Sequence, residues 1–298
     1  MQVAFWEIAP YLPGVGADRL ADLVSEYVRD NAGKAFEFMV EDCDAARKAK
    51  GLPPAEELRQ AKGEDKAVLE VVDKHRQDFG LKTFGELRAP GGGEHPTLLV
   101  QQKLETVESL SKIASPCNGI KDCLDTLRKM SVQFCISTTS PKPRVPVSIT
   151  SCGLDDYFPA EKVHSGESDF DPPRFKPDPS VYLKAAKAEN MDPANCIAVE
   201  DSGSGVGSAS NAEVGFIVGY VGASHISADM KDSHAKMLMS GSRAENGRGA
   251  EIVISHMKDL VPLVELFKTA RSAGNVRPFT FPAELLSSME QPVWVQGA

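Results

Sequence analysis

The sequence predicts an α/β protein with a parallel sheet, joined to a separate helical region. After SPCNGI (115–120), short apolar runs alternate with helical patterns, which is the order expected for a parallel sheet. In residues 17–110, by contrast, apolar residues recur at helical spacing and no strand pattern is convincing. The length of 298 residues suits one large domain or two modest ones.

The composition is that of an ordinary globular protein, with 42% hydrophobic and 25% charged residues. The net charge of −9 argues against non-specific binding to nucleic acid. No stretch has the length of a membrane span, and MQVAFWEIAP does not have the pattern of a secretory signal. We therefore expect an intracellular protein in a reducing compartment, either the cytoplasm or an organelle.

Six cysteines are scattered through the chain, at positions 43, 117, 123, 135, 152 and 196. None forms a CxxC pair, and no histidine spacing suggests zinc. Cys135 and Cys196 stand inside apolar, strand-like runs, so we interpret the cysteines as free, buried thiols.

The first 110 residues are predicted to form a helical domain. ADRLADLVSEYV places Leu20, Leu23, Val24 and Val28 on one helix face, and residues 67–80 and 98–114 follow the same pattern. Gly and Pro residues separate these segments, as in APGGGEHP (89–96).

Residues 111–272 are predicted to form the α/β core. The expected strands are the apolar runs 132–138, 162–166, 196–201, 215–221 and 251–254. The expected helices are 120–130, 147–154, 180–190, which Pro179 precedes, and one opening at 205–212. A polar insertion at 224–249 precedes the last strand. The C-terminal extension 273–298 carries aromatic residues among prolines, and we expect it either to wrap its own domain or to bind a protein partner.

Three polar segments stand where the carboxyl ends of the parallel strands should meet. FCISTTS ends in hydroxyl groups, FKPDPSVY carries a lysine, and IAVEDSGSGVGSA carries two adjacent carboxylates. Hydroxyls and a lysine can hold a phosphate, and paired carboxylates can hold Mg²⁺. The candidate phosphate-binding residues are Thr138, Thr139, Ser140 and Lys176, and the candidate metal ligands are Glu200 and Asp201.

Each of these residues also has an ordinary structural interpretation. Thr138 could simply end a strand, Lys176 could be a solvated loop residue, and the Glu–Asp pair could cap a helix. Their order, their spacing and their common place at strand ends favour a phosphoryl-transfer site. The glycines after Asp201 form neither GxGxxG nor a P-loop, which argues against a nucleotide-binding loop and a Rossmann dehydrogenase.

The three segments resemble motifs II, III and IV of the haloacid dehalogenase (HAD) superfamily over roughly residues 110–270. They are most similar to its phosphatase and phosphomutase branch with a helical cap, the β-phosphoglucomutase and CbbY-like group; KPDPSVYLKAA, 24 residues before the ED pair, is close to the family pattern. The resemblance implies a Rossmann-like core with a helical cap that selects substrate. It also implies Mg²⁺-dependent hydrolysis of a small phosphorylated metabolite, such as a sugar phosphate.

By this resemblance, Thr138 and Lys176 are catalytic residues. Thr138 would bind the transferring phosphoryl group, and Lys176 would balance charge around the nucleophile and phosphate. Glu200 and Asp201 would hold Mg²⁺, Asp201 most directly.

Motif I of the family, DxDx[TV], supplies the nucleophilic aspartate and the general acid/base, and no good copy is found. VAFWEIAPYL has the expected N-terminal place but puts Glu7 and Ala9 at the two aspartate positions. FMVEDCDAARKAKG contains Asp42 and Asp44, although its flanks are helical. ESDFDPPRFKP contains the pair at 169 and 171, but no strand precedes it.

Two explanations for the missing motif stay open. It has degenerated within the N-terminal segment, or it lies upstream of Met1. Without a nucleophile, the site could still bind Mg²⁺ and phosphate without turning substrate over. The two functional hypotheses are therefore a HAD-type phosphatase and a catalytically silent subunit with a structural or regulatory role, with 273–298 as the segment for a partner.

Overall fold

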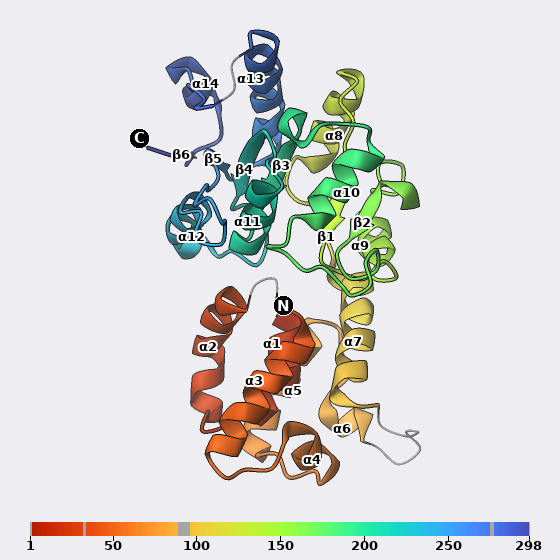
Figure 1. The fold of residues 1–298 in the computed structure, drawn as a ribbon. Coiled ribbons are helices and arrows are strands. Elements are labelled where there is room, and N and C mark those ends of the chain that lie inside the picture. Colours follow the sequence, from red (N-terminus) through yellow and green to blue (C-terminus); the bar gives the residue numbers. More distant parts are fainter. Residues whose placement is uncertain (1, 32–33, 89–95, 275–276, 298) are drawn as a thin grey trace. The chain divides into compact units, whose positions relative to one another are not determined.

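The computed structural model describes residues 2–31, 34–88, 96–274 and 277–297 (Figure 1). The chain divides into two compact units, Met1–Ala114 and Ser115–Ala298. The division follows the end of helix α7 (Leu98–Ile113), whereas the predicted boundary at 110/111 falls inside that helix. Every strand of the described residues belongs to the second unit. The predicted α/β class with an additional helical region is confirmed.

The first unit is helical in the residues described (Figure 1). Its elements are α1 (Gln2–Ile8), the 3₁₀ turn η1 (Ala9–Tyr11), α2 (Ala17–Asp30), α3 (Phe36–Ala49), α4 (Ala55–Gln60), α5 (Lys66–Asp78), α6 (Phe84–Leu87) and α7.

Local sequence explains several helix starts in this unit. Asp65 accepts hydrogen bonds from the backbone N–H groups of Ala67 (2.8 Å) and Val68 (3.2 Å), which satisfies two of the free donors at the start of α5. Thr83 and Glu86 form a capping box at α6. These caps depend on neighbouring residues alone, so they can be read from the sequence.

A buried ion cluster joins α1, α5 and α7. Arg76 is fully buried; it donates to Glu7 Oε1 and, at 2.7 Å, to Glu105 Oε1, while Gln101 Nε2 donates to Glu7 Oε2 at 3.2 Å. Burial raises the pKa of Glu7 well above its usual value. The segment VAFWEIAPYL therefore forms a helix and a 3₁₀ turn, and it is not the first strand of a sheet. Its Glu7 side chain is buried inside the helical core.

The second unit contains the strands and seven further α-helices within the described residues. Its helices are α8 (Ile120–Lys129), α9 (Val145–Ser151), α10 (Ser180–Ala188), α11 (Gly203–Asn211), α12 (Lys231–Met239), α13 (Leu260–Ser272) and α14 (Ala283–Ser288). Short 3₁₀ turns lie between these elements: η2 (Ala160–Lys162), η3 (Pro193–Asn195), η4 (Ala228–Met230) and η5 (Met257–Asp259). Its strands are β1 (Ile136–Thr138), β2 (Val163–Ser165), β3 (Ile197–Glu200), β4 (Phe216–Tyr220), β5 (Ile252–Ile254) and β6 (Trp294–Val295).

The strands form two separate ladders. β1 pairs with β2 in parallel, with Ser137 opposite His164. The second ladder has the order β3-β4-β5-β6, in which the first three strands are parallel and β6 is antiparallel. The predicted parallel arrangement therefore holds for the five strands that the sequence indicated, and the antiparallel β6 comes from the C-terminal extension.

Among the described residues, β1 has a strand partner on one edge only. Thr138 O accepts a hydrogen bond from Gly166 N, at the end of β2, at 2.7 Å. Because successive carbonyl groups of a strand point to opposite sides, Ser137 O points to the other edge. β1 is half-buried, not fully buried as its apolar sequence indicates, since only one of its edges is covered by a strand.

The described part of the C-terminal extension, residues 277–297, packs on its own unit. Phe279 lies 4.8 Å from Phe216 between ring centroids, and Phe281 packs against the same core cluster. Trp294 Nε1 donates to Asp232 Oδ1 at 3.0 Å and holds β6 beside α12. The expectation that this segment wraps its own domain is confirmed, and a protein partner for it stays a prediction.

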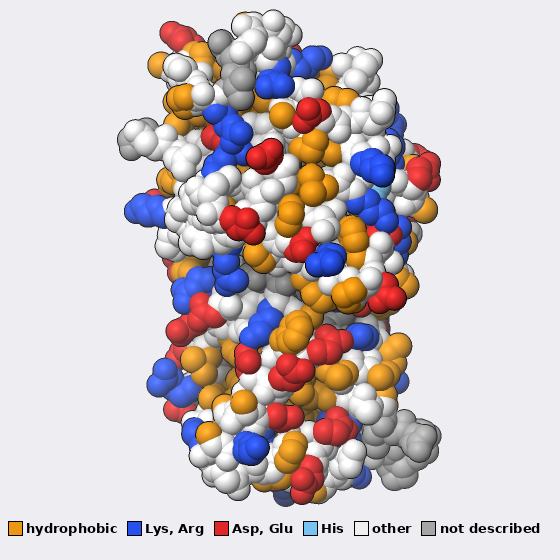
Figure 2. Space-filling model, in the orientation of Figure 1, with side chains coloured by type: hydrophobic (Ala, Val, Ile, Leu, Met, Phe, Trp, Pro, Cys, Tyr) orange, Lys and Arg blue, Asp and Glu red, His pale blue; other side chains and the backbone are white. Residues whose placement is uncertain are grey.

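The surface carries charges of both signs. On the face shown in Figure 2, acidic and basic side chains are interspersed with hydrophobic ones, and no continuous basic area is visible among the described residues. In the described part of the chain, no helix combines the length and the apolar character needed to cross a bilayer.

The buried ion cluster leads to a stability prediction. Arg76→Met leaves the carboxylates of Glu7 and Glu105 buried without their cation, which should lower the free energy of unfolding by about 3–5 kcal/mol. Urea unfolding followed by Trp6 fluorescence, in a Trp294→Phe background, measures the loss in the helical unit.

The matched control is Arg29→Met, because Arg29 pairs with Asp30 on the surface and should contribute less than about 1 kcal/mol. Equal losses for the two variants would contradict a special role for the buried cluster.

Candidate functional site

The hydroxyl-bearing segment forms a turn at the carboxyl end of β1. Thr138 Oγ1 accepts from Ser140 N at 3.0 Å, so its own proton remains available for a ligand. Ser140 O accepts from Ser165 Oγ at 2.7 Å, which ties the turn to β2. The adjacent Thr139 is half-buried in this turn.

The guanidinium of Arg144 lies beside these hydroxyls. Arg144 Nη2 donates to Ser140 Oγ at 2.7 Å, and burial lowers the pKa of its guanidinium, which nevertheless remains charged at neutral pH. Sequence reasoning missed Arg144, although PKPR (141–144) directly follows the hydroxyls.

Lys176 is the centre of the site. Its ammonium donates to Ser137 O at 3.0 Å, on the uncovered edge of β1, and also to Glu200 Oε1 at the end of β3. The side chains of Lys176 and Glu200 are 9% and 6% exposed, so this pair lies out of contact with bulk water. An ammonium has three donors, so one remains for a further acceptor.

Tyr182 and Gly205 complete the surroundings of Glu200. The Tyr182 hydroxyl donates to Glu200 Oε1. Burial, and to a lesser extent the negative charge of Glu200, raise the pKa of this phenol. On the other side, a Cβ at Gly205 would overlap Glu200 Oε2, so only glycine lets α11 begin this close to the carboxylate. The Glu200 side chain is therefore enclosed by α10, α11 and Lys176.

Asp201 has a different environment from its neighbour. Its side chain is 45% exposed, and Oδ2 lies 3.8 Å from His225 Nε2. His234 Nε2 donates to the main-chain oxygen of Asp201 at 2.6 Å and holds the backbone in place. Burial lowers the pKa of His225, so this imidazole is neutral at pH 7 and adds no positive charge beside the carboxylate.

The donor set can be tested for a magnesium ion from these contacts. Asp201 fits, because it is an accessible carboxylate with no strong donor on its side-chain oxygens. Glu200 does not offer a free side, because Lys176 and Tyr182 occupy Oε1 and Gly205 packs against Oε2. The structure brings Lys176 and Glu200 into direct contact, and Lys176 also contacts Ser137 O, next to Thr138 in β1. Asp201 directly follows β3.

The aspartates of FMVEDCDAARKAKG have structural contacts in the helical unit. They lie within α3, where Asp42 pairs with Lys34 and Asp44 Oδ1 accepts from Ala55 N at 2.7 Å, next to the start of α4. This segment is a helix and not a strand followed by a catalytic loop.

Asp169 belongs to the loop after β2, so the expectation that no strand precedes this pair of aspartates is wrong. It accepts from Ser165 N at 2.8 Å and pairs with Lys142 and Lys184 at 2.6 and 3.3 Å. These contacts fix the loop beside the Ser140 turn. Asp171, the second aspartate of ESDFDPPRFKP, is exposed.

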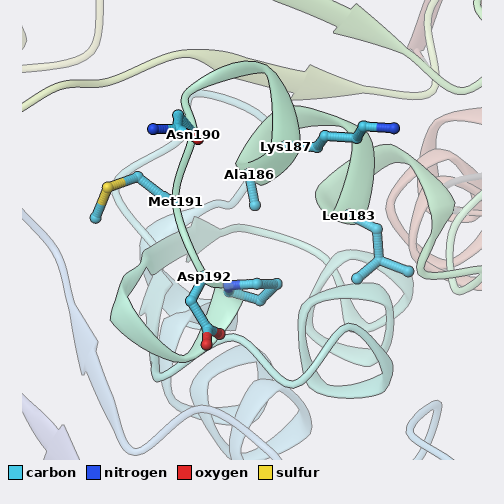
Figure 3. Close-up of a pocket in the computed structure, with 7 residues that line it drawn as sticks. Leu183, Ala186, Lys187, Asn190, Met191 and Asp192 are labelled. Atoms are coloured by element: carbon cyan, nitrogen blue, oxygen red, sulfur yellow. The ribbon is translucent and has the colours of Figure 1, made fainter.

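A shallow surface pocket of about 420 Å³ lies on the outer side of α10 (Figure 3). Leu183, Ala186 and Met191 supply apolar walls, and Lys187 and Asp192 supply charges. None of the predicted site residues lines it. It borders the segment leading into β3, at the amino end of the strand, whereas Asp201 follows the carboxyl end.

Comparison with known proteins decides the family. The family model described as haloacid dehalogenase-like hydrolase matches residues 20–213, which is more than half of the chain. The chain belongs to the haloacid dehalogenase-like hydrolases. Its match with 6-phosphogluconate phosphatase of Escherichia coli is 31% identical over 115 residues, covering 38% of this chain and 50% of that protein.

Two further similarities agree with membership of the HAD-like hydrolases. A CBBY-like protein of Arabidopsis thaliana is 34% identical over 100 residues, covering 34% of this chain and 30% of that protein. A HAD family hydrolase from Deinococcus radiodurans, solved with bound phosphate and sodium, has the same fold, with a TM-score of 0.50, 18% identity, and coverage of 93% of this chain and 91% of that chain. The chain thus spans half or less of the length of these two curated relatives. The predicted resemblance to the phosphatase and CbbY-like branch is confirmed.

Several residues of the site carry no sequence signal. His225 and His234 come from the polar insertion 224–249, where their spacing matches no motif. Tyr182 is part of the amphipathic pattern of α10 and looks like a core residue until its hydroxyl is seen on Glu200.

The contact between Gly205 and Glu200 leads to a second prediction. Gly205→Ala forces the carboxylate out of place and should lower the free energy of unfolding by about 1–3 kcal/mol, although alanine favours a helix. Urea unfolding followed by circular dichroism measures this loss.

Gly203→Ala is the matched control in the same helix. A Cβ there meets the flexible end of Met237 at 2.9 Å and Arg243 Cγ at an ordinary 3.7 Å, so the helix preference of alanine should offset the cost. If Gly205→Ala has the same free energy of unfolding as Gly203→Ala, Glu200 is not enclosed as described.

Proposed function

We propose that this HAD-like hydrolase binds Mg²⁺ and the phosphate group of a small phosphorylated sugar at the carboxyl ends of β1 and β3. The observation that carries the proposal is the contrast between two adjacent carboxylates. Glu200 is buried against Lys176, whereas Asp201 is accessible to an ion. In this proposal Asp201 is the metal ligand, and Glu200 is the counter-ion that holds Lys176 in position.

The remaining groups suit a phosphate. The free Thr138 proton, the third donor of Lys176 and the guanidinium of Arg144 can all donate to phosphate oxygens. A bound Mg²⁺ would offset the negative charge of the ester and polarise its oxygens. The name of the E. coli relative supports a sugar acid phosphate as the first substrate to test.

Hydrolysis of the ester in this family needs a carboxylate nucleophile. Glu200 is engaged by Lys176 and Tyr182, and Asp201 is assigned to the metal. These engagements support the second candidate function, a catalytically silent HAD-like subunit that binds the same ligands without turnover. Its structural or regulatory partner would be another protein.

Asp201→Asn tests the metal site. We expect it to weaken Mg²⁺ binding by about 10-fold or more, because a neutral amide replaces the one accessible carboxylate. Isothermal titration with MgCl₂ measures the affinity. Asp229→Asn, at an exposed aspartate in η4, should leave it unchanged.

Phosphate release distinguishes the two candidate functions. Mg²⁺-dependent release of phosphate from 6-phosphogluconate or related sugar phosphates, lost in Asp201→Asn but not in Asp229→Asn, would establish the enzyme. Binding of Mg²⁺ and inorganic phosphate without release would favour the silent subunit. If neither ligand binds to the unaltered chain, the proposed function is wrong.

A further inference from the structure

A cluster of three potential metal ligands lies outside the site described above. A Cys135 thiol, a His164 imidazole nitrogen and a Glu189 carboxylate oxygen all lie within 4.8 Å of one another. Cys135 directly precedes β1, His164 is the middle residue of β2, and Glu189 directly follows α10. Thr138 ends β1 at the other end of that strand, so the two groups of residues are distinct.

The backbone explains why these side chains meet. Side chains two residues apart in a strand share a face, so Cys135 points to the same side as Ser137. Ser137 pairs with His164 across the ladder, which places the imidazole on that side too. Helix α10 packs on both strands, and Glu189 directly follows its last residue. The cluster therefore depends on regular structure, not on a loop.

His164 supplies an independent observation. The residue is only 4% exposed, yet its Nε2 atom has no hydrogen-bond partner among the described residues. A buried polar atom left unpaired costs about 1–3 kcal/mol. An imidazole nitrogen without a hydrogen-bond partner is free to bind a cation.

We propose that Cys135, His164 and Glu189 form a Zn²⁺ site, with water in the fourth position. Sulfur, nitrogen and oxygen together are a typical ligand set for zinc, whereas Mg²⁺ prefers oxygen alone. Ligand atoms around a tetrahedral zinc lie about 3.4–3.6 Å apart, so each side chain needs to move by about 1 Å or less. The ion would connect β1, β2 and α10.

One contact competes with the metal. Lys162 Nζ pairs with Glu189 Oε2, and the Lys162 side chain is 31% exposed, so it can turn into solvent or leave the other oxygen to the ion. The Cys135 thiol must also lose its proton, which burial opposes by raising its pKa to about 11, and zinc supplies the charge that displaces it.

Cobalt absorption tests the site in the full chain after removal of metals. Co²⁺, used as a spectroscopic probe for Zn²⁺, should bind one per chain and give a thiolate-to-cobalt charge-transfer band that Zn²⁺ abolishes. Cys135→Ser should remove the band, and His164→Gln should weaken Zn²⁺ binding by about 100-fold or more. Cys196→Ser is the matched control and should retain both.

Alkylation of the unaltered protein gives a second readout, which does not depend on a variant folding. Zn²⁺ should slow the reaction of Cys135 with iodoacetamide at least about tenfold, while Cys152 reacts as before; peptide mass spectrometry measures both. The proposal is overturned if Zn²⁺ leaves the labelling of Cys135 unchanged, or if Cys135→Ser binds Co²⁺ with an unchanged spectrum.

Discussion

The Lys176 ammonium joins two ladders of strands that no backbone pairing connects in the described residues. It donates to Ser137 O on the uncovered edge of β1 and to Glu200 at the end of β3. Without the ammonium, Ser137 O would lose its donor and the buried Glu200 carboxylate would keep Tyr182 but lose its cation, at a cost of a few kcal/mol. The close start of α11, the position of Tyr182 and the exposure of Asp201 all follow from where this ion pair holds Glu200.

Much of the α/β unit was predictable because its signals are local. Pro179 marks the start of α10, and the apolar runs of β3 and β4 are long enough to identify as strands. The place of Lys176 and the two carboxylates at strand ends also follows from the order of elements. The pattern could not predict that Glu200 pairs with Lys176 while Asp201 stays accessible to an ion. This difference depends on how deeply each carboxylate is buried in the folded chain.

The remaining features depend on partners far apart in the chain. Glu7 stands in a segment that occupies the place of a family motif, but its contact with Arg76 spans 69 residues and makes it part of a helical core. His225 approaches Asp201 from an insertion with no motif. The spacing of cysteines and histidines also gave no indication of zinc, since Cys135 precedes β1, His164 lies in β2, and no short motif connects them. Only the folded backbone brings such residues together.

The short β1-β2 ladder has a consequence for how the protein opens in solution. Two strands of three residues form a marginal sheet on their own. By contrast, β3, β4 and β5 pair with one another and pack against a large apolar core. Amide hydrogens of Ile136 and His164 should therefore exchange with solvent through local openings of lower free energy than those of Val218. Such an opening separates Thr138 from Asp201 while the rest of the unit stays folded. The integrity of the candidate site is thus set by its least stable cooperative segment and not by the global stability of the chain.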